Sequence, residues 1–250
     1  MGNDRTTMKR AFTLIEVLVV AAILALLAAI LLPSLYKARQ QGKRALCLAN
    51  LHSLGLAASM YADDNRDRFW RYYVDTITPR GRLWWFGFEP DGPGSGTDRP
   101  LDKRHGALAS YLRSTDDGLQ CPSFPYDDGS YFPKFAAHSA SLGFNITLSN
   151  ARRSAYRNRF SSVFIFADGV HFDFNPGLNE GHYLQYASHP ELGMKTGYGH
   201  FRHNGRAQIL FLDTHAESQT PRGPLYPDSL PGGSAANLTD PAGGNSIYGG

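Results

Sequence analysis

Residues 9–33, "KRAFTLIEVLVVAAILALLAAILLP", contain an apolar run long enough to cross a membrane. Residues 17–32 are only Val, Leu, Ile and Ala, and Phe12–Ile15 extend the run to about 20 residues, the length of a membrane-spanning helix. One carboxylate, Glu16, lies inside the near end of the run. Because a lone acid in hydrocarbon costs about 2.5–3.5 kcal/mol on insertion scales, we expect Glu16 to have a partner.

A cleavable secretory signal is the alternative interpretation of this run, because Arg5, Lys9 and Arg10 precede it. A secretory signal has an apolar region of about 7–15 residues and ends in a small-residue cleavage site. Here the run is longer, contains Glu16 and is followed by "PSLYKARQQ" at 33–41. The sequence therefore favours a transmembrane helix.

A helical pattern continues after Pro33. Apolar and small residues recur at spacings of three and four, which is the period of an amphipathic helix: they are Leu35, Ala38, Gly42, Ala45, Ala49, Ser53, Leu56 and Met60. Pro33 removes one backbone hydrogen bond without having to end the helix. We expect one helix to about Tyr61, roughly 75 Å long, which ends at "ADDNRD", 62–67.

The middle of the chain is rich in runs typical of β-strands. "FWRYYV" (69–74), "LWWFGF" (83–88), "SSVFIFADG" (161–169) and "AQILFLDTHAE" (207–217) are aromatic or β-branched and bounded by turn residues. Residues 218–250 contain seven Gly and five Pro and predict a mobile tail or a loosely draped loop. The predicted organisation is α+β: residues 1–11 as a leader, a helix over 12–62, an antiparallel β-rich head over 63–217, and the tail.

Composition excludes some partners and leaves the cysteines open. Twenty-five basic against 22 acidic residues give a net charge of +3, too even to indicate a nucleic-acid partner. The densest basic stretch, "ARRSAYRNR" (151–159), predicts a solvated surface turn. Cys47 and Cys121 fit no metal-binding spacing, so either one disulfide or two free thiols is expected.

The basic leader, the hexapeptide "AFTLIE" and an apolar helix with Pro33 together resemble the N-terminus of type IV pilins and type II secretion pseudopilins. The resemblance implies a pilin-like fold, cleavage by prepilin peptidase between Ala11 and Phe12, and methylation of the new Phe12 amine. Ala11 stands where that peptidase normally finds Gly. No cofactor is implied.

The same resemblance implies an inner-membrane protein whose partners are copies of itself and other pilin-like subunits. Its helices would stack into the core of an extracytoplasmic filament, where the carboxylate of Glu16 would pair with the Phe12 amine of a neighbour. The charges give a conflicting orientation. Four basic residues follow the apolar run (Lys37, Arg39, Lys43 and Arg44) against three before it, and the positive-inside rule alone favours a cytoplasmic head. We follow the resemblance and expect the head outside.

Three further stretches, 47–69, 119–123 and 202–217, resemble the cysteine-bearing and C-terminal H-x9-DG segments of a bacterial group of prepilin-like proteins. His203 and Asp213 have the spacing of that C-terminal element, but Thr214 replaces its Gly. If the turn needs a positive φ at this position, Thr214 is strained.

The local pattern around His203 predicts a hairpin. Asn204–Gly205 is a two-residue turn signal, and residues 207–212 have the composition of a buried strand. His203 and Asp213 would then flank this strand and hydrogen-bond backbone at its two ends. The alternative is a calcium or zinc site near Asp213, His215 and Asp168. A ligand shared by His203 and Asp213 would require His203 to fold back, or each of the two to meet a different partner such as Asp168.

A structural subunit without a catalytic site is the leading functional hypothesis. A membrane-anchored metal enzyme is one alternative, based on nine histidines and on the pairs Asp168–His171 and Asp213–His215. No H-E-x-x-H, G-x-S-x-G or P-loop motif supports it. A glycan-binding tip is the other alternative, with an aromatic platform formed by Trp70, Tyr72, Tyr73, Trp84, Trp85 and Phe86.

Overall fold

The computed structural model describes residues 13–92, 94, 97–116, 118–172, 177–184, 198–221 and 234–236. The chain divides into two compact units, residues 1–42 and 43–250. The predicted leader, with Ala11 and Phe12, lies outside the described residues, and so does most of the tail.

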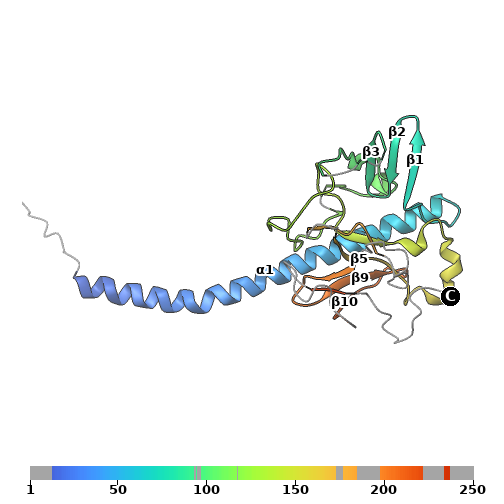
Figure 1. Ribbon diagram of the computed structural model, residues 1–250. Helices are drawn as coiled ribbons and strands as arrows, with labels where there is room; N and C mark the ends of the chain where they lie inside the picture. Colours follow the sequence, from blue (N-terminus) through green and yellow to red (C-terminus); the bar gives the residue numbers. More distant parts are fainter. Residues whose placement is uncertain are drawn as a thin grey trace, which may run out of the picture. The chain divides into compact units, whose positions relative to one another are not determined.

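The first element is one long helix, α1 (Leu14–Asp64), which continues through Pro33 (Figure 1). Beside the proline, the hydroxyl of Ser34 donates to the carbonyl of Leu31 at 2.8 Å. Arg66 and Asp67 then take φ values of 56° and 62°. This left-handed conformation ends the helix within the predicted "ADDNRD" stretch. The predicted length of the helix is confirmed to within three residues.

The face of α1 that the head buries is not the one predicted. The buried residues are Cys47, Leu51, Leu54, Gly55, Ala57, Ala58 and Ala62. The predicted stripe, which includes Leu35, Leu56 and Met60, is exposed. Both faces repeat with helical period, and periodicity alone does not say which face the sheet covers.

The head contains two sheets. The smaller one is an antiparallel meander of β1 (Tyr73–Ile77), β2 (Arg80–Trp84) and β3 (Gly87–Pro90). The larger one has eight strands among the described residues: β4 (Leu142–Asn145), β5 (Phe164–Phe172), β6 (Leu178–Glu180), β7 (Tyr183–Leu184), β8 (Tyr198–Phe201), β9 (Ala207–Phe211), β10 (Ala216–Gln219) and β11 (Ser234–Ala236). Short 3-10 helices η1 (Lys103–His105), η2 (Ala109–Tyr111), η3 (Ile146–Leu148) and η4 (Arg153–Arg159) connect these strands.

The longest strand, β5, organises the larger sheet. It pairs antiparallel with β4 and β9 through its first half and with β6 and β8 through its second half. β4 also pairs with β7 in parallel, so the sheet is mixed rather than purely antiparallel. Strand β11 lies within the predicted tail and pairs with β8, which corrects the expectation of an unstructured tail at Ser234–Ala236.

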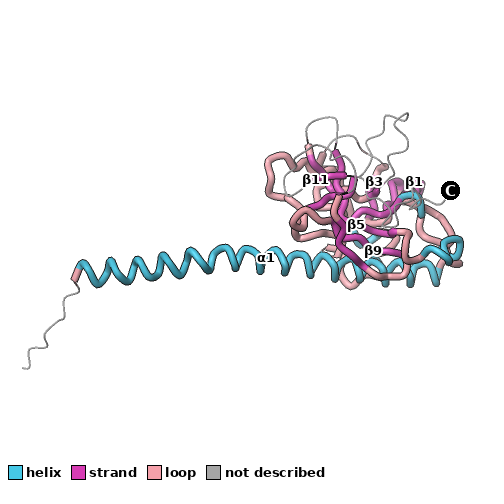
Figure 2. Tube along the Cα trace, turned by 90° about the horizontal axis from the view of Figure 1, so that it is seen from below, coloured by secondary structure: helices cyan, strands magenta, loops and turns pink. Residues whose placement is uncertain are grey.

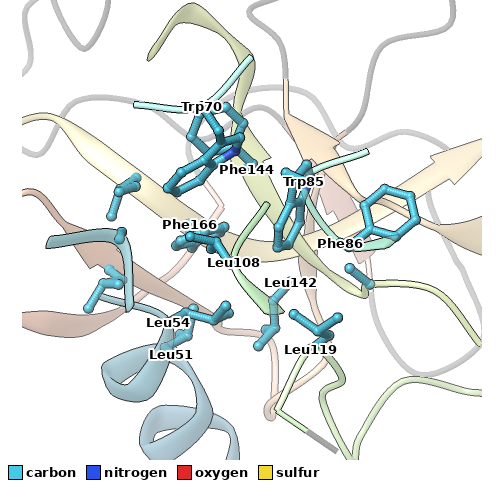
Figure 3. Packing of buried hydrophobic residues seen from close by; sticks show 14 of the residues in the cluster. Leu51, Leu54, Trp70, Trp85, Phe86, Leu108, Leu119, Leu142, Phe144 and Phe166 are labelled. Atoms are coloured by element: carbon cyan, nitrogen blue, oxygen red, sulfur yellow. The ribbon is translucent and has the colours of Figure 1, made fainter. Parts of the chain in front are cut away.

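The core fills the space between the C-terminal half of α1 and these sheets. Within the second unit, residues 43–64 of α1 run along β5 and β9, as Figures 1 and 2 both show. Leu51 and Leu54 point toward Leu142 and Phe166 of the larger sheet (Figure 3). Gly55 permits the close approach, because a Cβ there would lie 2.9 Å from a methyl carbon of Leu210. The helix is thereby fixed on the sheet.

Candidate functional site

The first turn of α1 is closed by a reciprocal cap. The backbone N–H and the hydroxyl of Thr13 both donate to Oε2 of Glu16 at 2.8 Å, and the N–H of Glu16 donates to the Thr13 hydroxyl at 3.3 Å. This is a capping box, in which the residue before the helix and the third helical residue satisfy each other's backbone donors. Thr13 is therefore a partner of Glu16 within the chain. The predicted Phe12 partner lies outside the described residues.

The segment that follows the cap has the surface of a membrane span. Every residue from Thr13 to Arg39 is exposed, including the large apolar side chains. Among the described residues, α1 is the one helix that is long and apolar enough to cross a membrane. Over residues 17–32 the helix is apolar on every side, which is typical of a helix surrounded by lipid or by other helices.

In the head, four side chains from four separate elements meet in the core. They are Cys47 of α1, Cys121 of the loop before β4, Asp168 of β5 and His203 of the β8–β9 turn. One ligand atom from each lies within 4.8 Å of the others, and all four residues are buried. We call this set the Cys–Asp–His cluster.

The contacts inside the cluster are short. The Cys47 thiol donates to Oδ1 of Asp168 at 3.4 Å, and the Cys121 sulfur lies 3.2 Å from Nε2 of His203. The same nitrogen lies 3.3 Å from Oδ2 of Asp168. Both thiols are free. The structure therefore brings Cys47 and Cys121 together without a disulfide, the second of the two alternatives that the sequence left open.

Local hydrogen bonds hold each member of the cluster in place. The N–H of Cys121 donates to the Ser141 hydroxyl at 2.8 Å, and the side-chain amide of Asn50 on α1 donates to the carbonyl of Gln120 at 2.8 Å. The N–H of Gln208 donates to Oδ2 of Asp168 at 2.7 Å. The two loops and the helix are thus tied to the same point on β5.

Arg202 supplies a buried positive charge beside the cluster. Its Nε and Nη2 atoms donate to Oδ1 of Asp168 at 3.0 and 2.8 Å, and Nη2 also donates to the carbonyl of Ser141 at 2.6 Å. Burial opposes ionisation of Asp168, but the charges of Arg202 and His203 hold the pKa of this carboxyl well below its ordinary value. Asp168 is therefore an anion in the core.

The two thiols differ in acidity. Burial raises the pKa of Cys47 well above its ordinary value, and the neighbouring Cys121 and Asp168 raise it further. Burial also opposes ionisation of Cys121, but the Cys47 thiol and Arg202 outweigh it and lower the pKa of Cys121 to about 6. Burial lowers the pKa of His203, while its contacts with Asp168 and Cys121 prevail and raise it to about 9. The surroundings thus make Cys121 the more acidic thiol of the two.

The metal set predicted from the sequence is not assembled. In the antiparallel register of β5 and β9, Asp168 lies beside Gln208, whereas Asp213 follows the other end of β9. Asp213 and His215 contact each other at an exposed turn. His171 is three residues from Asp168 on β5, and side chains at that spacing point to opposite faces of a strand. Asp168 is therefore not grouped with Asp213, His215 or His171. Its carboxylate contacts His203 instead.

The hairpin predicted at Asn204–Gly205 is confirmed. The two residues have φ values of 53° and 74°, and His203 and Arg206 exchange backbone hydrogen bonds across the turn. This turn directs the ring of His203 toward Asp168, so the expected backbone contact of that ring is wrong. Asp213 does accept a hydrogen bond from the backbone N–H of His215. Thr214 has a φ of 70°, the conformation that the replaced Gly would favour.

The aromatic residues that the sequence offered as an alternative binding platform do not form one exposed surface, because four of the six are buried in the core. Trp70, Trp84, Trp85 and Phe86 are buried. Trp85 donates its indole N–H to the carbonyl of His182 at 2.8 Å. Tyr73 is the exposed aromatic residue of the six. Clustered aromatic residues bury more apolar area in a core than any other side chains, which explains their place here.

Comparison with known families gives one match. Residues 6–32 match the family model described as the prokaryotic N-terminal methylation motif. The chain carries a prepilin-type signal. This signal supports a pilin-like or pseudopilin-like protein of the kind that prepilin peptidase processes and that its apolar helix anchors in a membrane. Comparisons with curated proteins and with solved structures give no match.

Two functional residues were missed in the sequence. The spacing Thr-x-x-Glu directly before an apolar run is the signature of a capping box, and it was available at Thr13 and Glu16. Arg202 had no such signal. Its role depends on the pairing of β8 with β5, which brings together residues 34 positions apart.

Proposed function

We propose that this chain is a structural pilin-like or pseudopilin-like subunit that polymerises through α1 into an extracytoplasmic filament. The observation that carries the proposal is the joint occurrence of the methylation motif at 6–32 and a fully exposed apolar segment of α1 over residues 17–32. Lipid covers such a helix in the membrane. Outside the membrane, neighbouring helices are the other surface that can cover it.

The exposed stripe on the second half of α1 supports helix packing between copies. Leu46, Leu56 and Met60 are exposed while the opposite face is buried on the head. Small residues, Ala45, Ala49 and Ser53, lie on the exposed side and permit close approach of another helix.

Processing is the first test of the proposal. In cells that contain the peptidase, mass spectrometry of the membrane-extracted chain should find an N-terminus at Phe12 with a methylated amine. Ala11→Gly, which restores the residue that the peptidase normally finds, should give an equal or higher cleaved fraction. A wild-type chain that keeps Met1 in those cells would contradict the proposal.

Glu16 tests assembly separately from helix capping. Gln can replace Glu in a capping box but carries no charge, whereas Val provides neither group. If the charge pairs with the Phe12 amine of a neighbour, Glu16→Gln and Glu16→Val should both insert into the membrane and both reduce filament yield strongly. If the cap is the main role of Glu16, the Gln variant should assemble like the wild type.

The side of the membrane is tested by a reporter. An enzyme that is active only outside the cytoplasm, fused after residue 250, should be active if the head is exported. Arg44 is one of the four basic residues that favour the opposite orientation, and it donates to the hydroxyl of Ser218 on β10 at 2.7 Å. It therefore has a role in the fold of the head. A silent reporter on an abundant fusion protein would reverse the topology.

The proposal does not assign a catalytic site. The Cys–Asp–His cluster is closed to solvent, since its four side chains are buried and hydrogen-bonded to the core. A catalytic metal site needs an open position for substrate, which this cluster does not present.

A second function, glycan binding, is favoured by one cavity of about 490 Å³ in the head. Tyr72, Trp84 and Phe132 line it together with Arg99 and Lys134. Aromatic faces beside polar groups suit sugar rings. The full-length chain in detergent should bind a member of a glycan array, and Phe132→Ala should weaken that binding. Ile77→Ala, at an exposed apolar residue outside the cavity lining, is the control. An array without any bound glycan would exclude this second function.

A further inference from the structure

We propose that the Cys–Asp–His cluster is a structural zinc site that clamps α1 to the sheet. Its ligands are Sγ of Cys47, Sγ of Cys121, one carboxylate oxygen of Asp168 and Nε2 of His203. The site does not depend on the function proposed above, because all four ligands lie in the second unit of the chain.

The ligand atoms lie close to the separations of a tetrahedral zinc shell. Zinc binds sulfur at about 2.3 Å and nitrogen or oxygen at about 2.0–2.2 Å. At tetrahedral angles these radii place ligand atoms about 3.3–3.8 Å from one another. Sγ of Cys47 lies 3.4 Å from Oδ1 of Asp168, and Sγ of Cys121 lies 3.2 Å from Nε2 of His203. The same nitrogen lies 3.3 Å from Oδ2, the other oxygen of the Asp168 carboxylate, and the four ligand atoms all lie within 4.8 Å of one another. Four side chains from distant parts of the chain thus converge to the dimensions of one ion.

The chemistry of the donors selects zinc among the common divalent ions. Two thiolates and an imidazole are ligands for zinc, whereas calcium and magnesium bind through oxygen. The absence of a free position and the burial of all four residues indicate a structural site rather than a catalytic one.

Charge supports the same assignment. A zinc ion with two thiolates, one carboxylate and a neutral imidazole has a net charge of −1. Arg202 is buried and donates twice to the Asp168 carboxylate, so it brings the whole group to neutrality. A positive side chain that hydrogen-bonds a ligating carboxylate is a common outer partner of metal sites. Burial of a charged group is much less costly when its charges cancel.

The position of the ligands explains what the ion would do. Cys47 is the first buried residue of α1 in the second unit, Asp168 is on the central strand, and the other two ligands are on loops. One ion would therefore fix the helix, the sheet and both loops at one point. No local spacing motif in the sequence predicts such a site, because the ligands come from four separate elements.

Metal content of the full-length chain, purified in detergent without chelators, tests this proposal. Elemental analysis should find about one zinc per chain. His203→Ala and Cys47→Ser should lose it, whereas His215→Ala, at the exposed turn, should retain it. Exchange of the wild-type site with Co²⁺ should give the intense visible bands of tetrahedral cobalt and a sulfur-to-cobalt charge-transfer band. The cobalt spectrum is measured on the wild-type chain, so it does not depend on how well the variants fold.

Three results would overturn the proposal. One is a wild-type chain with only trace metal and a Cys47–Cys121 disulfide in non-reducing peptide mass spectrometry. Another is zinc that persists at full stoichiometry in the His203→Ala variant and is lost from His215→Ala. The third is a cobalt-loaded wild-type chain with weak octahedral bands and no charge-transfer band from sulfur.

Discussion

Residues 14–42 and 43–64 belong to the same helix, α1, but they relate to their surroundings in different ways. The first segment has no buried side chain, while the second buries Cys47, Leu51, Leu54 and its small residues on the head. In the first segment nearly any apolar residue serves, because lipid is a permissive partner. In the second, each position meets one particular neighbour, such as Gly55 beneath Leu210.

This difference predicts that substitutions in the second segment and in the residues around it change the stability of the head, whereas those in the first do not. The chain has three tryptophans, Trp70, Trp84 and Trp85, and all lie in the head. Tryptophan fluorescence during urea unfolding in a fixed detergent therefore reports on the head alone.

The largest effect is expected for Arg202→Leu. The variant leaves the Asp168 carboxylate buried without its ion pair, and the loss of one partner of a buried pair lowers the free energy of unfolding by about 3–5 kcal/mol. Urea unfolding of the two proteins measures the difference. Arg206→Ala, at an exposed position of the same turn, should change stability by less than about 0.5 kcal/mol. Similar values for the two variants would show that Asp168 does not depend on Arg202.

The next effect tests which face of α1 is buried. Leu54 is 0% exposed and Leu56 is 48% exposed, two positions apart on the same helix. Leu54→Ala should lower the free energy of unfolding by about 2–5 kcal/mol, because it leaves a cavity in the core. Leu56→Ala should change it by less than about 0.5 kcal/mol. The reverse order would mean that the head covers the stripe predicted from the sequence.

A smaller effect of opposite sign is expected at Thr214. A β-branched residue with a φ of 70° is strained, and Gly relieves that strain at some cost in chain entropy. Thr214→Gly should raise the free energy of unfolding by about 1 kcal/mol. Thr214→Ala keeps a Cβ and should raise the free energy of unfolding by less than Thr214→Gly does. A destabilised Gly variant would show that contacts of the Thr214 side chain outweigh the backbone strain.

The smallest effect is expected in the first segment of α1. Leu27 is exposed, and Leu27→Ala should leave the tryptophan unfolding curve unchanged within about 0.5 kcal/mol. A shift as large as that of Leu54→Ala would mean that the two segments do not differ as described.

The sequence predicted the elements that depend on local signals. The length of α1, the hairpin at Asn204–Gly205 and the strand after it all follow from neighbouring residues. The prepilin-type signal also lies in one continuous stretch. Such features can be predicted because their physical cause lies within a few residues of their effect.

The features that the sequence did not predict depend on pairings between distant strands. The buried face of α1 is set by where the sheet lies. The ligand set around Asp168 is set by the register of β5 with β8 and β9. The predicted metal site combined Asp168 with Asp213 and His215, which are close to each other in the sequence. Asp213 follows one end of β9, whereas Asp168 lies beside the other end, so this set does not come together. Strand β11 was missed because three small residues between glycines and prolines carry no pattern.

The pairing of β11 with β8 has a consequence for solubility. Residues Gly199–Phe201 of β8 are paired on one side with Ser234–Ala236. Without that partner, β8 would present unpaired N–H and C=O groups along an open edge, and such an edge recruits strands from other molecules into intermolecular sheets. Residues Ser234–Ala236 therefore protect the head against aggregation. A chain shortened to residue 221 would keep its core and lose that protection.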